Sequence, residues 1–299
     1  MRAKTRRWEP NMLLDVSVRF PNIGIEFSNL GQSISVFGFE IAYYGMIIAF
    51  GMVMGYFVAV WQAKRTGQDK EIYLDLALYA IIISVIGARI YYVIFNWSFY
   101  SEQPLEILNI KGGGLAIYGG IIAGLSTAFV FAKLKKLSFW VLADTSVLGL
   151  ITGQMIGRWG NFFNREAFGD YTNNLFAMQL KLSEVSQSNV TDSMKAHLAT
   201  IDAVQYVQVH PTFLYESVWN LVLLILLIIY SKHKKFDGEV VLLYLVGYGV
   251  GRLWIESLRT DALLAWGTNY PISQAVSIGL IVIGLLFIFV KRIRIRKNK

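Results

Sequence analysis

The sequence lacks the residues on which many common sites depend. Cysteine is absent from all 299 positions, which excludes disulfide bonds, thiolate metal sites and a cysteine nucleophile of the protein's own. Only three histidines occur, and they are scattered, so neither a haem site nor a zinc cluster is expected. Any thiol chemistry must therefore use the thiol of a substrate.

Charged residues are also scarce, at 16% of the chain, whereas hydrophobic residues make up 55% and the mean hydropathy is +0.47. This composition is typical of a membrane protein. A helix needs roughly 20 apolar residues to cross the hydrocarbon core, and seven runs approach that length. We therefore expect an all-α polytopic membrane protein, a single integral membrane domain over residues 1–299, with spans near 41–61, 76–97, 115–132, 139–156, 213–230, 240–256 and 272–290.

The distribution of basic residues predicts the orientation of these spans. The net charge is +8, and Lys and Arg gather in the loops after the first, third and fifth spans and in the C-terminal tail. Because such loops face the cytoplasm, we expect a cytoplasmic C-terminus and an external N-terminus, although the basic N-terminus argues mildly for the opposite. The polar segment 171–209 should form a small external lobe between the fourth and fifth spans. The basic cytoplasmic loops account for most of the positive net charge, so no nucleic-acid partner is expected.

Two charged residues of the sixth span need an explanation. Arg252 and Glu256 are four residues apart, with Tyr248 one turn before and Arg259 one turn after, so all four share one face of the helix. Each charge would cost roughly 2.5–3.5 kcal/mol if it faced lipid at the centre of the bilayer. The face must therefore contact protein or a water-filled cavity. A buried ion pair that joins two helices is the structural alternative to a functional site.

Further polar and glycine-rich clusters occur at the predicted external ends of the other spans. Ion pairs scattered for stability have no reason to share one depth, so this convergence favours a site near the outer interface. Guanidinium groups bind phosphate oxygens in pairs, and Arg158 and Arg252 therefore suit a lipid phosphate. Arg89 and Asp144 lie deeper and are expected to be structural partners of other helices. The clustered residues are Tyr44, Tyr118, Gly119, Gly120, Arg158, Asn161, Glu166, Gly169, His210 and Glu216.

Seven stretches carry a resemblance to a known family. They are FPNIG at 20–24, YYGM at 43–46, GARIYYV at 87–93, GGGLAIYGG at 112–120, GRWGNFFNREAFG at 157–169, HPTFLYES at 210–217 and YGVGRLWIESLRTD at 248–261. In this order they resemble prolipoprotein diacylglyceryl transferases, enzymes of lipoprotein maturation in the bacterial inner membrane. The resemblance covers most of the chain, apart from the lobe and the two termini.

This resemblance implies a reaction and its partners. The diacylglyceryl group of phosphatidylglycerol, a membrane lipid, would pass to the lipobox cysteine thiol of a prolipoprotein signal peptide, leaving a thioether and glycerol 1-phosphate. No metal or organic cofactor is implied. The chief alternative is an organic-anion or lipid transporter or flippase, because intramembrane Arg and Glu also mark substrate pathways. It predicts polar residues across the whole membrane depth and inverted repeats, and neither pattern is visible.

The resemblance also implies roles for individual residues. Arg158 and Arg252 are expected to stabilise the departing phosphate, with Glu166 and Glu256 orienting these arginines. The expected catalytic residues are Tyr44, Tyr118, Arg158, His210, Arg252 and Glu256. The expected substrate-binding residues are Gly119, Gly120, Arg158, Asn161, Glu166, Gly169, Tyr248 and Arg252.

One position departs from the family pattern. Many relatives have a histidine where this chain has Tyr118, so a mechanism in which that histidine takes the thiol proton does not transfer unchanged. Arginines near a thiol of pKa about 8.5 favour its ionised form without a dedicated base. Tyr44 and Asn161 are expected to form hydrogen bonds with the lipid headgroup or the incoming peptide.

Overall fold

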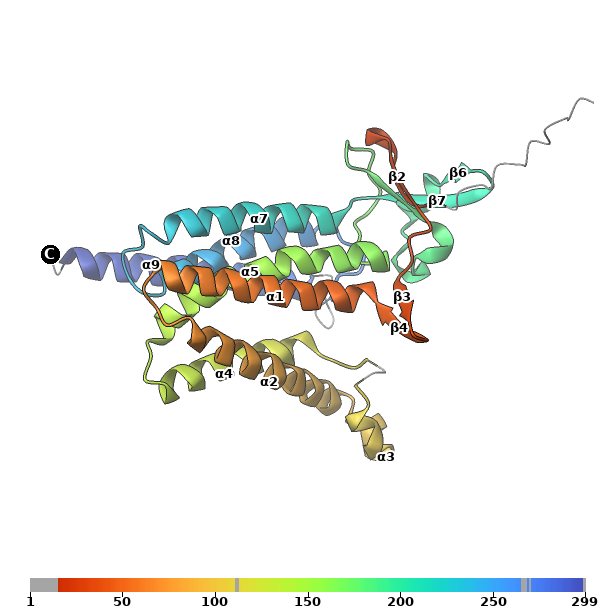
Figure 1. Cartoon of the computed structure of the whole chain (residues 1–299). Helices are drawn as coiled ribbons and strands as arrows, with labels where there is room; N and C mark the ends of the chain where they lie inside the picture. The colour runs from red at the N-terminus through yellow and green to blue at the C-terminus, as the bar shows by residue number, and fades with distance from the viewer. Residues whose placement is uncertain (1–15, 111–112, 265–267, 269, 298–299) are drawn as a thin grey trace, which may run out of the picture. The chain divides into compact units, whose positions relative to one another are not determined.

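The computed structural model describes residues 16–110, 113–264, 268 and 270–297, and most of them are helical (Figure 1). A helix covers most of each of the seven apolar runs, although residues 41–42 belong to a strand and residues 115–116 precede a helix. The long helices are α1 (Tyr43–Arg65), α2 (Glu71–Phe95), α4 (Ile117–Leu134), α5 (Phe139–Asn164), α7 (Thr212–Tyr230), α8 (Glu239–Glu256) and α9 (Ile272–Lys297). The run expected at 76–97 divides at Asn96, whose φ of −121° and ψ of 31° end α2 before the short α3 (Trp97–Glu102) begins.

Six of these helices are long and apolar enough to cross a membrane, namely α1, α2, α4, α5, α7 and α9, so the chain is a helical membrane protein. The helix outside this group is α8, which has 18 residues and includes Glu239, Arg252 and Glu256. The same charges that make α8 of functional interest lower its apolar character. α8 is therefore not among the six candidate spans, although the sequence predicts a span there.

The expectation of an all-α protein is wrong, because the chain also forms two antiparallel sheets. The larger has the strand order β2-β1-β5-β7-β6. Strands of three to six residues give no long apolar run, so a search for spans passes over them. The strands are β1 (Val16–Phe20), β2 (Ile25–Ser28), β5 (Met178–Lys181), β6 (Ala199–Ile201) and β7 (Val204–Val209), and β3 (Ser33–Val36) pairs with β4 (Phe39–Ala42) in the second sheet.

The polar segment 171–209 supplies three strands of the larger sheet. Between β5 and β6 the chain forms two 3-10 turns and the short α6 (Asp192–Ala196), whose first turn is capped by the Thr191 hydroxyl. Further 3-10 turns lie at Pro21–Ile23 and Pro104–Leu108. The pairing of β1 with β5 joins the N-terminal part of the chain to this segment.

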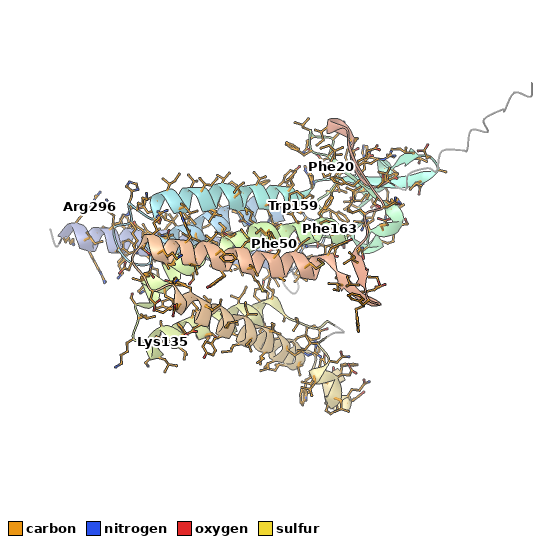
Figure 2. All side chains as sticks on the ribbon, viewed as in Figure 1. Phe20, Phe50, Lys135, Trp159, Phe163 and Arg296 are labelled. Carbon is orange, nitrogen blue, oxygen red and sulfur yellow. The ribbon has the colours of Figure 1, made fainter. Side chains whose placement is uncertain are left out.

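A buried core fastens the larger sheet to the helix ends that carry the candidate site. Val18, Leu180 and Val207 of the sheet are fully buried, and they belong to one apolar cluster with Phe162 of α5 and Phe213 of α7. Phe20 of β1 belongs to the same cluster, and Phe163 of α5 packs against it (Figure 2). Burying side chains of this size contributes about 1.5–3 kcal/mol each. The sheet therefore stabilises the C-terminal end of α5 and the N-terminal end of α7.

The chain groups into two compact units whose boundaries fall within the long helices. Unit 1 comprises residues 1–49, 154–220 and 248–279, and unit 2 comprises 50–153, 221–247 and 280–299. Within unit 2, a Cβ added at Gly55 would lie 2.5 Å from the Gly149 carbonyl oxygen, so these glycines let α1 and α5 approach closely. Gly87 and Gly119 serve α2 and α4 in the same way.

Candidate functional site

A buried carboxylate joins three helices within unit 1. Glu216, in the second turn of α7, is 4% exposed. Its Oε2 lies 2.7 Å from Nη2 of Arg158 on α5, and its Oε1 lies 2.8 Å from Nη1 of Arg252 on α8. One carboxylate thus brings both of the predicted phosphate-binding arginines to one place.

The ion pairs continue along α8 and into the segment after it. Nη2 of Arg252 lies 2.6 Å from Oε2 of Glu256, which is 3% exposed. Arg259 approaches the same oxygen at 3.9 Å and forms two hydrogen bonds of 2.9 Å with the Asp261 carboxylate. The result is an alternating series of three guanidinium and three carboxylate groups, which we call the arginine network: Arg158, Glu216, Arg252, Glu256, Arg259 and Asp261.

Helical spacing and one glycine explain how the network forms. Arg252 and Glu256 are four residues apart, so their side chains meet on one face of α8, as the sequence predicts. A Cβ added at Gly251 would collide with the indole of Trp219 on α7. The missing side chain therefore lets α7 and α8 approach within unit 1, which brings Arg252 within reach of Glu216.

The segment after α5 adopts an unusual backbone. Arg165 and Ala167 have φ of 53° and 55°, in the left-handed region that costs non-glycine residues roughly 1–3 kcal/mol. Buried Arg165 offsets part of this cost, since its Nε lies 2.5 Å from Glu184 and its Nη2 donates to the Leu30 carbonyl. Sequence reasoning missed this ion pair, because nothing in the spacing of Arg165 and Glu184 relates them.

Asn161 and Glu166 pair with each other across this bend. The amide Nδ2 of Asn161 donates to Oε1 of Glu166 at 2.9 Å. Glu166 was expected to orient an arginine, whereas Glu216 is the carboxylate that lies between the two arginines. Tyr44 packs its ring against Gly160, where an added Cβ would lie 2.6 Å from the ring. Tyr44, Gly160, Asn161 and Glu166 therefore belong to unit 1, as the arginine network does.

Gly169 lies where two other segments converge. Its N–H donates to the His210 carbonyl at 3.0 Å, and it forms a bridge with Arg259. An added Cβ would lie 2.8 Å from both His210 Cβ and the Leu258 carbonyl oxygen. Only glycine fits there, so Gly169 connects the bend after α5 with the end of the arginine network.

His210 precedes α7 and is half-buried. Burial lowers the pKa of its imidazole, and the Asp170 carboxylate opposes that shift only in part. Nδ1 lies 3.3 Å from the Tyr215 hydroxyl. At neutral pH His210 is therefore uncharged and has the capacity to accept a proton.

The remaining predicted residues are distributed between the two units. Tyr248 lies half-buried on α8 in unit 1, one turn before Arg252. Tyr118, Gly119 and Gly120 lie at the start of α4 in unit 2, where Gly119 and Gly120 pack against α2. The structure therefore assembles most predicted residues in one unit and places these three in the other.

Arg89 and Asp144 both have structural partners, but only Asp144 binds another long helix, as the sequence predicts for both. Arg89 donates to backbone carbonyls within unit 2. Asp144 accepts from Lys234 Nζ at 3.0 Å and from the backbone N–H groups of Gly238 and Val241, so it caps the first turn of α8. Among the residues that the structure describes, no group of three His, Cys, Asp or Glu side chains has the geometry of a metal site.

Fold and site together define a class: a helical membrane protein in which three helices and a sheet hold a partly buried arginine network. Comparison with known proteins refines this class. The family model described as prolipoprotein diacylglyceryl transferase matches residues 32–290. The chain belongs to this family.

Curated relatives agree with the family match. The phosphatidylglycerol–prolipoprotein diacylglyceryl transferase of Bacillus mycoides (strain KBAB4) is 43% identical over 242 residues, which is 81% of this chain and 84% of the relative. The enzyme of the same name from Bacillus cytotoxicus is 42% identical over the same shares. The match includes every residue of the arginine network, since all of them lie within 32–290.

Proposed function

We propose that this protein transfers the diacylglyceryl group of phosphatidylglycerol to the lipobox cysteine thiol of prolipoproteins. The products are a thioether-linked lipoprotein precursor and glycerol 1-phosphate, in the first step of lipoprotein maturation. Family membership and the names of the relatives support this proposal. The arginine network adds a physical reason, because it holds guanidinium groups in place that can stabilise negative charge on a departing phosphate.

The proposed location is the bacterial inner membrane. In this topology α8 is the sixth of seven spans, the segment 171–209 is external, and the C-terminal end of α9 is cytoplasmic, in keeping with its basic last turn. The external N-terminus belongs to residues 1–15, which lie outside the described part of the chain. Arg158 and Arg252 would then lie toward the external leaflet, where the lipid headgroup and the prolipoprotein meet.

The observation that carries the proposal is the sharing of Glu216 by two guanidinium groups. Glu216 holds the guanidinium groups of Arg158 and Arg252 close together. A second anion, the lipid phosphate, could therefore accept hydrogen bonds from both arginines at once. During transfer the thiolate sulfur attacks the glycerol carbon that bears the phosphate, a C–S bond forms and the C–O bond breaks. The electron pair moves to the phosphate oxygen, and preorganised guanidinium groups stabilise that growing charge.

The other residues have supporting roles in this proposal. Glu216 and Glu256 position the arginines, whereas Tyr44, Asn161 and Glu166 form hydrogen bonds to the headgroup or the peptide. Gly169 and Tyr248 shape the binding surface in unit 1, whereas a substrate-binding role for Gly119 and Gly120, at the start of α4 in unit 2, rests on the sequence alone. His210 and Tyr118 are the candidate acceptors of the thiol proton, and neutral His210 already has the required protonation state.

The test uses purified protein, phosphatidylglycerol vesicles and a lipobox peptide, with a Cys→Ser peptide as control. We expect a thioether-linked product and glycerol phosphate with the cysteine peptide alone. Arg252→Lys and Arg252→Ala should each slow transfer by about 10²-fold or more, because an ammonium cannot bridge Glu216 and Glu256 as a planar guanidinium does. The matched control is Arg296→Lys at the exposed end of α9, which should retain normal transfer.

Two outcomes would contradict the proposal. Near-normal transfer by both Arg252 variants, with folding intact, would remove the assigned role of the arginine. Failure of the unaltered protein to form the thioether, with both substrates recovered unchanged, would favour a transporter instead, because transport leaves its substrates chemically intact.

A further inference from the structure

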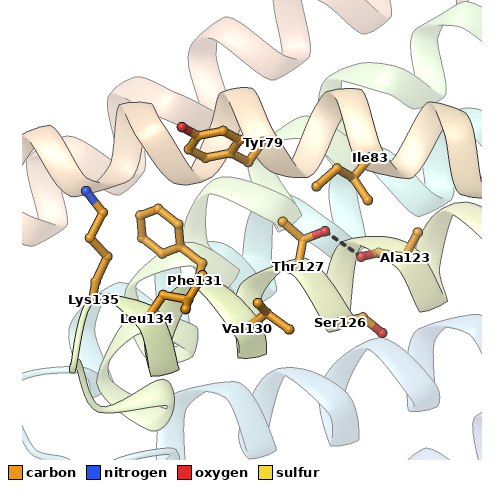
Figure 3. A pocket seen from close by; sticks show the side chains of 9 residues that line it. All are labelled: Tyr79, Ile83, Ala123, Ser126, Thr127, Val130, Phe131, Leu134 and Lys135. Carbon is orange, nitrogen blue, oxygen red and sulfur yellow. Dashed lines mark hydrogen bonds between the residues drawn. The ribbon is translucent and has the colours of Figure 1, made fainter.

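An open groove lies between α2 and α4 within unit 2, and nothing in the proposed reaction uses it (Figure 3). Its volume is about 490 Å³. Tyr79 and Ile83 of α2 lie opposite Phe131 and Thr127 of α4, and Lys135, the residue after α4, lies at one end. The groove is thus an apolar channel with a cation at its end.

The walls of the groove fit a hydrocarbon chain. Tyr79 is 54% exposed and Val130 is 51% exposed, so the groove is accessible from outside the protein. Thr127, which also lines it, donates its hydroxyl to the Ala123 carbonyl at 2.8 Å. Because that donor is already satisfied within α4, the groove offers an occupant mainly apolar contact.

The length of the groove matches half a bilayer. At 1.5 Å per helical residue, the distance from Ala123 to Lys135 along α4 is roughly 18 Å. The hydrocarbon core of a bilayer is about 30 Å thick, so one leaflet accounts for roughly 15 Å. An acyl chain that fills the groove would therefore place its lipid headgroup at Lys135.

Lys135 has the charge and the exposure to receive that headgroup. Its side chain is 49% exposed, and Nζ lies 3.2 Å from Asp75 Oδ2 and 5.6 Å from the centre of the Phe131 ring. An ammonium has three donors, so the pair with Asp75 occupies only one of them. Exposed pairs of this kind contribute little, about 0–1 kcal/mol, and Asp75 therefore presents a weak competitor to a phosphate.

We propose that this groove binds an anionic phospholipid, with an acyl chain between α2 and α4 and its phosphate at Lys135. Lys133 and Lys136 lie on either side of Lys135 in the sequence and raise the positive potential at this helix end. In the topology proposed above, the lipid belongs to the cytoplasmic leaflet. The site is independent of the transferase reaction, because none of the proposed catalytic residues lines it.

A reporter in the groove tests the proposal directly. The chain has no cysteine, so Ser126→Cys, at an exposed position of the groove wall, can be labelled alone with a bimane fluorophore. Brominated phosphatidic acid and brominated phosphatidylcholine are then titrated against the full-length protein in micelles. We expect half-quenching at a phosphatidic acid concentration at least fivefold lower than that of phosphatidylcholine. A label at Leu125→Cys, exposed on the same helix but outside the groove, should be quenched equally by both lipids.

Variants that change the charge at one position test whether Lys135 binds the lipid phosphate. Lys135→Gln should raise the half-quenching concentration of phosphatidic acid threefold or more, and Asp75→Asn should lower it because the competing carboxylate is gone. The matched control is Lys133→Gln, which removes the same charge outside the groove and should change the value less than twofold. Native mass spectrometry of phosphatidic acid retained by the unlabelled Lys135→Gln protein repeats the comparison without a fluorophore.

Equal quenching of the Ser126→Cys label by the two lipids would overturn the proposal. So would equal effects of Lys135→Gln and Lys133→Gln, because the cation would then act only through general attraction. Transfer activity has no part in these measurements, so their failure would leave the proposed transferase function untouched.

Discussion

Two arginines of this chain have opposite kinds of hydrogen-bonding partner. In unit 1, Arg252 pairs with the carboxylates of Glu216 and Glu256. In unit 2, Arg89 is 6% exposed and donates all its N–H groups to neutral backbone carbonyls. The acceptors are the carbonyl oxygens of Glu106 at 2.5 Å, Ile107 at 2.8 Å, Asn109 at 3.0 Å, and Gly113 and Gly114 at 2.9 Å.

The difference separates a structural arginine from one that is suited to a ligand. Carbonyl acceptors belong to the chain, so Arg89 can release them only if the segment before α4 rearranges. Carboxylates are anions on flexible side chains, and a phosphate is another anion with oxygens at similar spacing. Arg252 can therefore exchange a carboxylate for a phosphate, whereas Arg89 cannot exchange its carbonyl partners without a change in the backbone. Substitutions can test this contrast.

The largest expected effect follows from Glu216→Gln. This change removes the charge that holds Arg158 and Arg252 together but keeps the size of the side chain. We expect transfer to fall by about 10²-fold, which corresponds to roughly 2.7 kcal/mol of lost transition-state stabilisation. The measurement is kcat and KM for phosphatidylglycerol, with the main loss in kcat because misplaced guanidinium groups fail at the departing phosphate.

Glu239→Gln is the matched control for this substitution. Glu239 is also a buried glutamate paired with an arginine, since its Oε1 lies 2.7 Å from Arg292, but both belong to unit 2. We expect lower stability with kcat within a few-fold of normal. If Glu239→Gln lowers kcat as much as Glu216→Gln does, buried charge in general would matter and the contrast between the two units would fail.

Arg89→Lys should cost stability and leave the chemistry of the arginine network unchanged. A lysine has three donors for the five carbonyls, so at least two acceptors lose their partner. We expect a loss of about 2 kcal/mol in the free energy of unfolding, read as a lower melting temperature in detergent. Arg296→Lys, in an exposed position, should have no measurable effect, and an unchanged melting temperature for Arg89→Lys would show that the carbonyl contacts contribute little.

The sequence predicts the positions of the helices better than it predicts which side chains pair between different helices. Apolar runs locate the long helices because a span needs many apolar residues in succession, and the Arg252–Glu256 pair follows from helical spacing. Glu216 is found in its motif, but its position between two arginines depends on the packing of α5, α7 and α8. Spacing along one helix carries no information about that packing.

The sheet illustrates a second limit. β1 pairs with β5, although Val18 and its partner Leu180 are far apart in the chain. Strands of four to six residues have weak local signals, and pairing over such a separation leaves no periodic trace. The Arg165–Glu184 ion pair, which depends on the same long-range packing, was missed for the same reason.

A smaller effect contrasts the two halves of α1. Gly55→Ala places a methyl group 2.5 Å from the Gly149 carbonyl oxygen, and such overpacking costs about 1–2 kcal/mol. Gly45→Ala meets no atom within 4 Å and should stabilise slightly, because alanine favours a helix. Melting temperatures should therefore move in opposite directions, and a fall in both would mean that the position along α1 does not decide the outcome.

The smallest expected effect concerns the pH dependence of stability near His210. Burial lowers the pKa of this imidazole below the value of about 6.5 that it has when unfolded, so the unfolded chain binds more protons between those two values. The contribution of neutral His210 is therefore fully present above about pH 6.5 and is lost as the pH falls toward the folded pKa. Between pH 7.5 and 5.5, the unaltered protein should lose slightly more of its melting temperature than His210→Gln, whose side chain does not titrate. Equal losses would assign the pH dependence to other groups, with the nearby Asp170 carboxylate as the first to test.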